Sequence, residues 1–557
     1  MKSPLPTSSA TQNIRSDSPR RYVHGWENGR AFVFRAMFSF AALSSLLVVA
    51  LGSFPGWVDW WRFFGRHRSL GDSCPFEQPD LSVPLFHATR PRLFASLARS
   101  FNGSVPHSII LPAAHHVLHA ESDAEYMYWK QTANLKYLMD SYPIDGGVVV
   151  LNSKLEGYEI VVYLPEQNDR DIAFLGPLPS KEYIIKEYHV QNVFSIVDLP
   201  DHLSVKAKTN VEILTTVESV DLYNSLPANV VEKLARIDVA VAFSDVALQA
   251  FYQARFVKTK EELTRLVFAS HLASWVHKRV EKYIAFSKEV NEIWLHTEFV
   301  RLSALCGGDI QSYEPIIGAG PNAATLHYRT GFNRAISHVP VKDETFVLID
   351  AAPEFAGYTS DLTRTYARSR KWTKEMEEVF GIVNRVQTKF IHEYYNLGAD
   401  WMTINQLSKV DLTNELVEAE FIFGSVEEAL ANNVAFIFMP HGLGHPVGLE
   451  VHDPTPSNFV RPLEQSGFAP PTELADYLLQ TEKFHLAPYN VASYEVFKGH
   501  ITTVEPGVYF IPKILEAAKN GPIGKYVNWE KIEHGDYVSL GGVRIEDVIL
   551  IDHDGSK

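Results

Sequence analysis

The feature that most constrains the fold is a change of pattern near Lys258. Before it, apolar strand-like runs such as 146–151 and 158–162 alternate with helix-like stretches, which is an α/β pattern. From residue 260 to 304, apolar residues recur at helical spacing over two long segments, which predicts a pair of helices. Beyond them the sequence becomes rich in strand-forming residues. We therefore expect a smaller α/β domain followed by a larger α+β domain, at residues 85–255 and 256–557.

The first 84 residues fall into three segments of different character. Residues 1–35 are rich in Ser, Pro and Arg and form a polar N-terminal tail. No charged residue occurs in 36–58, and as a helix this run would be ~34 Å long, against a hydrocarbon core of ~30 Å. Residues 59–84 contain scattered Pro and Gly and are expected to be a linker.

Residues 36–58 are therefore predicted to be a transmembrane signal-anchor. Trp57, Trp60 and Trp61 lie at its end, where indole rings favour the membrane interface. Basic residues are more frequent before the segment than after it, which predicts a single-pass protein with residues 59–557 on the non-cytoplasmic side. The alternative is a signal peptide cleaved at the small residues of 50–52, which would give a secreted protein.

Composition excludes several classes of protein. The 557 residues include 66 acidic and 51 basic residues, for a net charge of −15, so nucleic acid is not expected as a partner. Two cysteines, Cys74 and Cys306, are too few for a disulfide framework or a cysteine-based zinc cluster, and they leave the redox compartment open. The sequon at Asn102 is too short a pattern to carry weight.

Two aspartates follow a hydrophobic strand in the second domain. The strand 347–349 ends in Asp350, and Asp361 comes eleven residues later, after a segment that contains Gly357. A reversal at the glycine would bring both carboxylates to one point, where they repel each other unless cations lie between them. Taken alone, the pattern is better explained by an exposed strand end and a turn aspartate than by a metal site.

Three histidines lie within twelve positions in a glycine-rich segment. His441 and His445 have the i, i+4 spacing of a zinc-protease helix, but Gly442 stands where that motif needs glutamate, and Pro446 also argues against a helix. We expect extended backbone that lets a ligand approach closely. A lone histidine is usually structural, whereas His441, His445 and His452 together favour a functional site.

Two further strands end in acidic residues. One delivers Glu505 into a Pro-Gly turn, and the other carries Arg544 and Glu546 two positions apart, on one face of the strand. A carboxylate that faces a core needs a partner, and a metal ion is one candidate. The alternatives are an exposed strand end for Glu505 and a buried Arg–Glu pair for Arg544 and Glu546.

One imidazole and four carboxylates then form a candidate metal site. Its members are Asp350, Asp361, His445, Glu505 and Glu546. These oxygen and nitrogen ligands suit Mn²⁺, Co²⁺, Zn²⁺ or Fe²⁺ better than a soft thiolate metal, and four carboxylates balance the charge of two divalent ions. We expect Mn²⁺, with the other three as alternatives. A hydroxide bridging two such ions would be a nucleophile near neutral pH.

Five blocks of this sequence closely resemble the metallopeptidase family of aminopeptidase P, prolidase and methionine aminopeptidase, in the family's order. They are residues 322–328, the segment of Asp350 and Asp361, 441–453, 503–509 and 541–547. The resemblance implies the pita-bread fold for 256–557. It also implies that Asp350 binds one metal ion, that Asp361 and Glu546 bridge both, and that His445 and Glu505 bind the second.

The resemblance assigns further roles around the metal ions. Glu505 would orient or deprotonate the attacking water, and His441 and His452 would contact substrate and stabilise the tetrahedral intermediate. His327 would help to hold the substrate, and Arg544 would support the metal ligands without touching the ions.

The sequence of the expected N-terminal domain resembles that of some members of this family and not of others. Residues 125–138 look like the creatinase-like N-terminal domain of aminopeptidase P and prolidase, although Lys130 stands where an arginine is usual. The implied reaction is hydrolysis of Xaa-Pro peptide bonds, with proline-containing peptides as substrates, and a homodimer is left open. Val491 replaces the arginine with which prolidases clamp a substrate carboxylate, which favours an aminopeptidase over a strict Xaa-Pro dipeptidase. Residues 453–497 look longer than the family's link and could form a lid.

Two other readings of the chain stay open. A non-catalytic pseudopeptidase could use the same scaffold as a binding protein, but it would have lost ligands that this chain keeps. A related hydrolase such as creatinase lacks the complete metal set.

Overall fold

The computed structural model divides into Met1–Ser73 and a compact unit, Cys74–Lys557. It describes residues 74–102, 105–115, 129–140, 144–217, 219–237, 239–308, 310–328, 339–394, 400–457, 460–461, 491–492 and 499–550. The predicted tail at 1–35, the predicted anchor at 36–58 and most of the predicted linker at 59–84 lie outside these residues. Within them, no helix combines the length and apolarity that crossing a bilayer requires.

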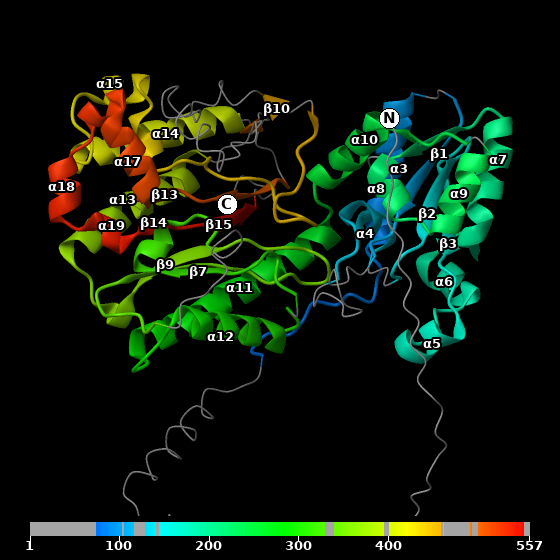
Figure 1. The fold of residues 1–557 in the computed structure, drawn as a ribbon, viewed down its shortest axis with the longest axis horizontal. Coiled ribbons are helices and arrows are strands. Elements are labelled where there is room, and N and C mark those ends of the chain that lie inside the picture. The colour runs from blue at the N-terminus through cyan, green and yellow to red at the C-terminus, as the bar shows by residue number, and fades with distance from the viewer. Residues whose placement is uncertain are drawn as a thin grey trace, which may run out of the picture. The chain divides into compact units, whose positions relative to one another are not determined.

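The N-terminal domain is built on one mixed sheet of six strands in the order β4-β3-β2-β1-β5-β6 (Figure 1). The strands are β1 (His107–Pro112), β2 (Val148–Ser153), β3 (Tyr158–Leu164), β4 (Asn192–Ser195), β5 (Glu212–Thr215) and β6 (Ala242–Phe243). β1 pairs antiparallel with β2 and parallel with β5. Because β1 and β5 run the same way, their carboxyl ends meet at one edge of the sheet.

Apolar cores cover both faces of this sheet. Successive residues of β2 point to opposite faces, so Val149 and Leu151 join one cluster and Val148 and Val150 join the other. Burial on both faces explains the unbroken valine run that the sequence shows. The helices of this domain are α3 (Phe86–Phe101), α4 (Ala133–Met139), α5 (Asp169–Leu175), α6 (Lys181–Tyr188), α7 (Leu199–Lys208), α8 (Ser219–Asn224), α9 (Ala228–Arg236) and α10 (Asp245–Phe256).

The predicted pair of helices opens the C-terminal domain. α11 (Lys260–Phe286) begins at a capping box, in which Thr259 and Glu262 exchange side-chain-to-backbone hydrogen bonds, and α12 (Glu292–Leu305) follows. Both helices contribute to one core cluster with strands β7 (Ile316–Ala319) and β8 (Phe346–Asp350). Figure 1 shows them along one side of that sheet.

The strands of the C-terminal domain form short antiparallel ladders. β7, β8 and β9 (Thr363–Ala367) make one sheet, β12 (Ile501–Val504) pairs with β15 (Asp547–Leu550), and β13 (Gly507–Tyr509) pairs with β14 (Gly542–Arg544). Isolated bridges join Thr363 to Glu546 and Pro446 to Thr502. These ladders therefore bring strand ends from distant parts of the chain to one place.

A second layer of helices packs on these ladders. The helices are α13 (Lys374–Lys389), α14 (Trp401–Glu418), α15 (Val426–Ala431), α17 (Pro512–Asn520), α18 (Trp529–His534) and α19 (Tyr537–Leu540). Their apolar faces form one large cluster with Val504, Val508 and Val543. In the stretch 453–497, where the sequence predicts an insert, the structure describes only 453–457 and one short pair, β10 (Val460–Arg461) with β11 (Val491–Ala492).

One predicted strand is interrupted. Arg544 ends β14 and Glu546 precedes β15, so the two residues do not lie on one continuous strand. The reason is a change of partner at Ile545. Its N–H donates to Pro506, whereas the N–H of Glu546 donates to Thr363 in β9. Both side chains still reach the same site.

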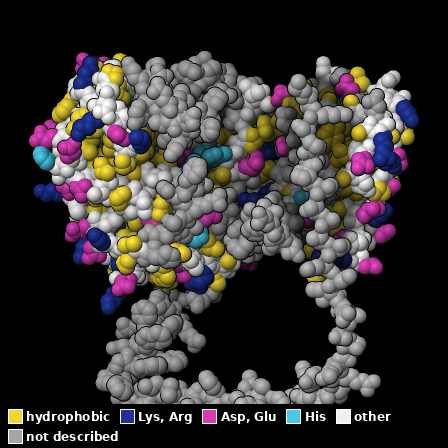
Figure 2. Space-filling model, viewed as in Figure 1, with side chains coloured by type: hydrophobic (Ala, Val, Ile, Leu, Met, Phe, Trp, Pro, Cys, Tyr) yellow, Lys and Arg dark blue, Asp and Glu magenta, His cyan; other side chains and the backbone are white. Residues whose placement is uncertain are grey.

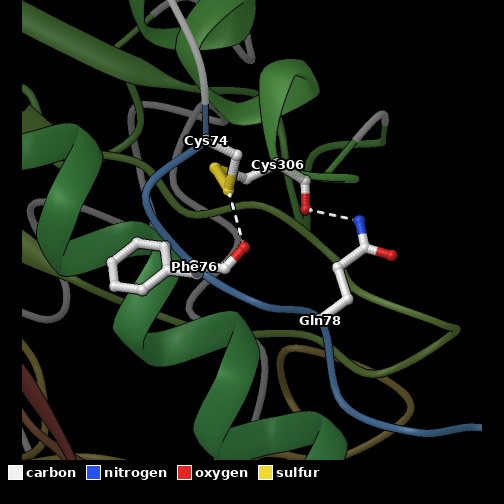
Figure 3. The surroundings of a disulfide bond; sticks show 4 residues. All are labelled: Cys74, Phe76, Gln78 and Cys306. Carbon is white, nitrogen blue, oxygen red and sulfur yellow. Dashed lines mark hydrogen bonds between the residues drawn. A yellow bond between two sulfur atoms is a disulfide. The ribbon is translucent and has the colours of Figure 1, made fainter. Parts of the chain in front are cut away.

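A disulfide joins Cys74 to Cys306 across 232 residues (Figure 3). Cys306 is the C-cap of α12, and its carbonyl accepts a hydrogen bond from the side chain of Gln78 at 3.1 Å. The first described residues of the chain are thus fixed to the C-terminal domain. The sequence excludes a disulfide framework but carries no signal that would pair these two cysteines.

The surface mixes charges of both signs. On the face shown in Figure 2, Lys and Arg side chains of the described residues are interspersed with Asp and Glu.

Candidate metal centre

Two strand ends supply the first carboxylates. Asp350 is the last residue of β8 and lies opposite Thr363 in β9, while Asp361 precedes β9 by two residues. The chain reverses between the aspartates, where Phe355 and Tyr358 form a bridge. The predicted hairpin therefore exists, and it brings both aspartates to one buried site.

Three of the five predicted ligands form the tightest group. Ligand atoms of Asp361, His445 and Glu546 all lie within 4.8 Å of one another, the only such group found among the described residues. Glu505 is adjacent, because its Oε1 lies 3.4 Å from His445 Nε2. Asp350 completes the set through a tyrosine that contacts both aspartates.

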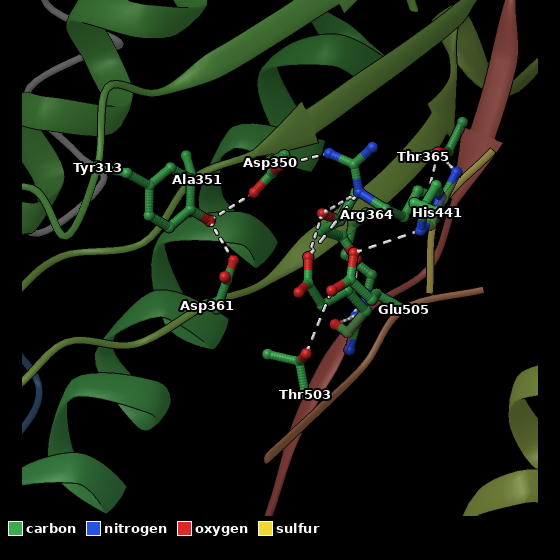
Figure 4. A network of polar contacts seen from close by, with 12 residues as sticks. Tyr313, Asp350, Ala351, Asp361, Arg364, Thr365, His441, Thr503 and Glu505 are labelled. Carbon is green, nitrogen blue, oxygen red and sulfur yellow. Dashed lines mark hydrogen bonds and ion pairs between the residues drawn. The ribbon is translucent and has the colours of Figure 1, made fainter. Parts of the chain in front are cut away.

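That tyrosine is Tyr313, which the sequence analysis missed. Its hydroxyl lies 2.5 Å from Asp350 Oδ1 and 2.6 Å from Asp361 Oδ1, between the two carboxylates in Figure 4. It precedes β7, whose Ile316 lies opposite Asp350. Only this strand pairing brings the tyrosine to the site, and the pairing leaves no local signal in the sequence.

Hydroxyl groups and a guanidinium hold the carboxylates from behind. Thr363 Oγ1 donates to Glu546 Oε2 at 2.6 Å, and Arg544 forms a buried ion pair with Asp350. Arg544 also donates to Thr363 Oγ1 and to the hydroxyl of Tyr509, each at 3.0 Å. Thr363 could have been inferred from sequence, because it lies two residues beyond Asp361 in an extended segment and so faces the same side.

The hydrogen bond of His445 leaves one ring nitrogen free to bind a metal ion. Its Nδ1 lies 3.1 Å from the carbonyl of Pro446, and since a carbonyl can only accept, Nδ1 carries the hydrogen. When the ring is neutral, Nε2 presents a lone pair towards the space beside Asp361 and Glu505, each 3.4 Å away. This is the arrangement typical of a metal-binding histidine, with the tautomer fixed from outside the site.

Both ring nitrogens of His441 have partners. By the same reasoning its Nδ1 donates to the carbonyl of Gly442 at 2.8 Å, so Nε2 accepts from Tyr509, 3.0 Å away. Burial first, and then the charges of Arg544 and His327, lower the pKa of His441 to about 3. His441 is therefore neutral at pH 7, and His327 is close enough to act on it.

His452 lies against His445, with ring centroids 4.2 Å apart. It is more exposed than His441 and His445, so His452 and the exposed His327 are the predicted substrate residues that face outward. Their roles stay predictions.

The glycines of the histidine segment act differently from the expectation. A Cβ on Gly444 would lie 2.2 Å from the carbonyl oxygen of Thr503, so the close approach that glycine permits is to a neighbouring strand. Because of this close approach, the carbonyl of His445 accepts a hydrogen bond from the N–H of Thr503, and the N–H of His445 donates one to Thr503 Oγ1. The segment is not helical, as predicted, but it is bent at several positions, and at Gly444 the chain itself fills the space expected for a ligand.

Burial, and after it mutual repulsion, raises the pKa values of Asp350, Glu505 and Glu546. Burial raises the pKa of Asp350 to about 6 and that of Glu505 to about 7, although Arg544 opposes the first shift and His445 the second. Burial and the charges of Asp361 and Glu505 raise the pKa of Glu546 strongly. Burial lowers the pKa of His445, but Asp361 and Glu505 outweigh it and raise the pKa to about 9. Divalent cations would relieve this repulsion, so the donor set fits them.

Comparison with known proteins reveals matches to both domains. A model described as metallopeptidase family M24 matches residues 264–553, and one described as aminopeptidase P, N-terminal domain, matches 86–214. A probable Xaa-Pro aminopeptidase PEPP of Coccidioides posadasii (strain RMSCC 757 / Silveira) is 28% identical over 444 residues, covering 78% of this chain and 86% of its own. A second probable Xaa-Pro aminopeptidase of that strain is 32% identical over 317 residues, covering 55% and 59%.

Solved structures share the fold. Proline aminopeptidase P II from Yersinia pestis has a TM-score of 0.65 at 21% identity, covering 84% of this chain and 94% of its own. The Pseudomonas aeruginosa aminopeptidase PepP has a TM-score of 0.64 at 22% identity, covering 85% and 94%. The expected pita-bread domain with a creatinase-like N-terminal domain is thereby confirmed.

Proposed function

We propose that this chain, which belongs to metallopeptidase family M24, is a peptidase. It hydrolyses the peptide bond between the first residue of a peptide and a proline in the second position. The observation that carries this proposal is the buried group of Asp361, His445 and Glu546, with Asp350 and Glu505 beside it. Its relatives include probable Xaa-Pro aminopeptidases, and the aminopeptidase P N-terminal domain is present. The chain is a metal-dependent hydrolase.

Two divalent ions, which we propose to be Mn²⁺, would be held by the five ligand side chains. Their four carboxylates carry a charge of −4 when ionised, and two such ions balance it. When bound, the ions supply an acidified water near neutral pH and polarise the scissile carbonyl. Co²⁺, Zn²⁺ and Fe²⁺ suit the same donors.

Glu505 would accept the proton of the attacking water. Its carboxylate lies at the edge of the ligand group, where it accepts a hydrogen bond from Thr503 Oγ1 at 3.3 Å. A carboxylate within hydrogen-bond reach of the attacking water can act as its general base. His452 would donate to the oxygen of the tetrahedral intermediate, with His327 nearby to hold the peptide.

His441 would contact substrate at the same site only after a change of hydrogen-bond partner. Its Nδ1 hydrogen is committed to Gly442 and its Nε2 to Tyr509. Substrate contact by this residue therefore requires the release of one of these bonds, which distinguishes it from His452.

A peptide panel tests this function. The full chain would be incubated with a Phe-Pro-Ala tripeptide, a Phe-Pro dipeptide and a Phe-Ala-Ala control, with added Mn²⁺ or with chelator. Metal-dependent release of phenylalanine from the tripeptide supports the proposal. Cleavage of the dipeptide alone would indicate a prolidase. Intact peptides, together with no bound metal, would indicate a pseudopeptidase.

We also propose that residues 36–58 anchor the chain in a membrane, with the catalytic domain on the non-cytoplasmic side. The Cys74–Cys306 disulfide supports this orientation, because disulfides persist mainly in oxidising compartments. Carbonate extraction and protease protection of the full chain test it. A carbonate-soluble product cleaved near residue 52 would favour secretion instead. Light scattering of the purified chain would show whether it forms a homodimer.

A further inference from the structure

A buried ion cluster lies directly behind the histidine segment. Asp453 follows His452, and its Oδ1 accepts from Arg255 Nη2 at 2.7 Å while its Oδ2 accepts from Lys258 Nζ at 2.8 Å. All three side chains are at least 97% buried. Arg255 also binds Glu450 Oε2 at 2.8 Å, so two cations face two anions. None of these residues belongs to the metal centre.

The cations come from the junction of the two domains. Arg255 lies in the last turn of α10, and Lys258 lies in the short connection to α11. Arg255 Nη1 also donates to Asn134 in α4 of the N-terminal domain, at 2.8 Å. The carboxylate of Asp453 is therefore held by the segment that joins the domains.

The cluster fixes the turn that carries His452. The N–H of Asp453 donates to the carbonyl of Pro446 at 3.0 Å, which closes the turn beside His445. A Cβ on Gly448 would lie 2.6 Å from Asp453 Cγ, so only glycine leaves room for this carboxylate. The carbonyl of Gly448 in turn accepts from both the N–H and the hydroxyl of Thr359, each at 2.9 Å.

We propose that Asp453 is a positioning residue, which holds His452 over His445 through its buried ion pairs with Arg255 and Lys258. The domain junction thereby sets the place of a substrate-contacting histidine. This inference rests on the proposed role of His452. A buried carboxylate with two cationic partners has one stable position, so the turn that bears it has one position as well.

A double-mutant cycle tests whether Asp453 acts through His452. In the Mn²⁺-loaded full chain, Asp453→Asn is expected to lower kcat/KM for the tripeptide at least ~10-fold, mainly through kcat, with unchanged metal content. If Asp453 works by placing His452, the same change in a His452→Ala background costs less than ~3-fold. Losses that multiply, or a loss of metal from Asp453→Asn, would overturn the inference.

A matched control distinguishes the effect of holding His452 in position from the effect of losing any buried charge. Asp411 is also a buried carboxylate, paired with Lys389 between α13 and α14. Asp411→Asn is expected to leave kcat/KM within ~2-fold of the wild type. Lys258→Gln removes one cation and keeps the carboxylate. Lys258→Gln is expected to lower kcat/KM in the same way as Asp453→Asn, but by a smaller factor. It replaces Asp453→Asn in the test if that variant does not fold.

Hydrogen exchange gives a readout that does not depend on activity. In Asp453→Asn, the amide hydrogens of Asp453 and Thr359 are expected to exchange at least ~10-fold faster, because their carbonyl partners lie in the released turn. Unchanged exchange would overturn the inference even if the wild type proved inactive. An inactive wild type whose turn loosens as predicted would instead contradict only the proposed function.

Discussion

Arg544 forms a buried ion pair with Asp350, although 194 residues separate them. The same guanidinium donates to Thr363 and to Tyr509, and the hydroxyl of Tyr509 reaches His441. One cationic side chain thus links Asp350, a predicted metal ligand, to a histidine on the other side of the site. It also offsets part of the negative charge that the carboxylates concentrate there.

Replacing Arg544 should damage both stability and activity. Arg544→Met leaves Asp350 as a buried carboxylate without its cation, which typically costs about 3–5 kcal/mol. We expect a lower Tm and a fall of kcat/KM of at least ~100-fold at saturating Mn²⁺. Thermal melts and peptide kinetics measure the two effects. Arg385→Met breaks an exposed pair with Glu415 instead and should change neither.

Tyr313→Phe should weaken metal binding more than catalysis. The substitution removes a hydroxyl that bonds to both Asp350 and Asp361 while keeping the ring. Loss of such a supporting hydrogen bond costs about 10–100-fold in metal affinity. We expect a raised Kd for Mn²⁺ by calorimetry and near-normal kcat once the ion is saturating. An unchanged Kd would show that the hydroxyl does not orient the ligands.

The sequence predicted the donors of this site and missed much of what holds them. Asp350 and Glu505 are visible because each follows an apolar strand, and Asp361 is visible because a glycine-containing reversal separates it from Asp350. Tyr313 and Tyr509 are invisible because they reach the site through strand pairing, which the local pattern does not specify. The disulfide was not predicted for the same reason, because Cys74 and Cys306 are brought together only by the folding of the chain at the end of α12.

Errors in detail had local causes as well. Arg544 and Glu546 were expected on one strand, but the hydrogen bond from Glu546 N–H to Thr363 interrupts it. The glycines were expected to admit a ligand, whereas Gly444 admits the backbone of Thr503. In both cases the local sequence could not indicate which neighbouring strand the backbone would contact.

His277 should make the fold sensitive to acid. Its Nε2 donates to the carbonyl of Ala351 at 3.0 Å, and burial lowers its pKa to about 3. Below pH ~6.5, the ordinary pKa of histidine, the unfolded chain therefore binds a proton that the folded chain does not bind. The free energy of unfolding then falls by up to ~1.4 kcal/mol per pH unit. The contribution of the neutral, buried His277 to the free energy of unfolding is complete above pH ~6.5 and is lost as the pH approaches 3.

Denaturant unfolding in excess chelator, between pH 7.5 and 4.5, measures this dependence. His277→Gln keeps the donor to Ala351 without a titrating ring, so its stability should fall less steeply with acid than that of the wild type. His534→Gln, at an exposed position, should retain the wild-type slope. Equal slopes for all three proteins would refute the assignment.

The disulfide should contribute to stability and not to chemistry. Cross-linking across 232 residues removes freedom mainly from the unfolded chain, worth about 5 kcal/mol in the entropic model. Cys74→Ser should lower Tm in the absence of reductant and leave kcat/KM within ~2-fold. A thiol titration of the denatured wild type should find no free thiol. Two free thiols would show that the bond does not form.

The central claim is that five side chains hold two divalent cations. An anomalous-difference map at the manganese edge, from crystals of the full chain grown with Mn²⁺, tests it most directly. The account predicts two peaks, both within reach of Asp361 and Glu546, with His445 and Glu505 beside one and Asp350 beside the other. A single peak, or no peak among these side chains, would contradict it.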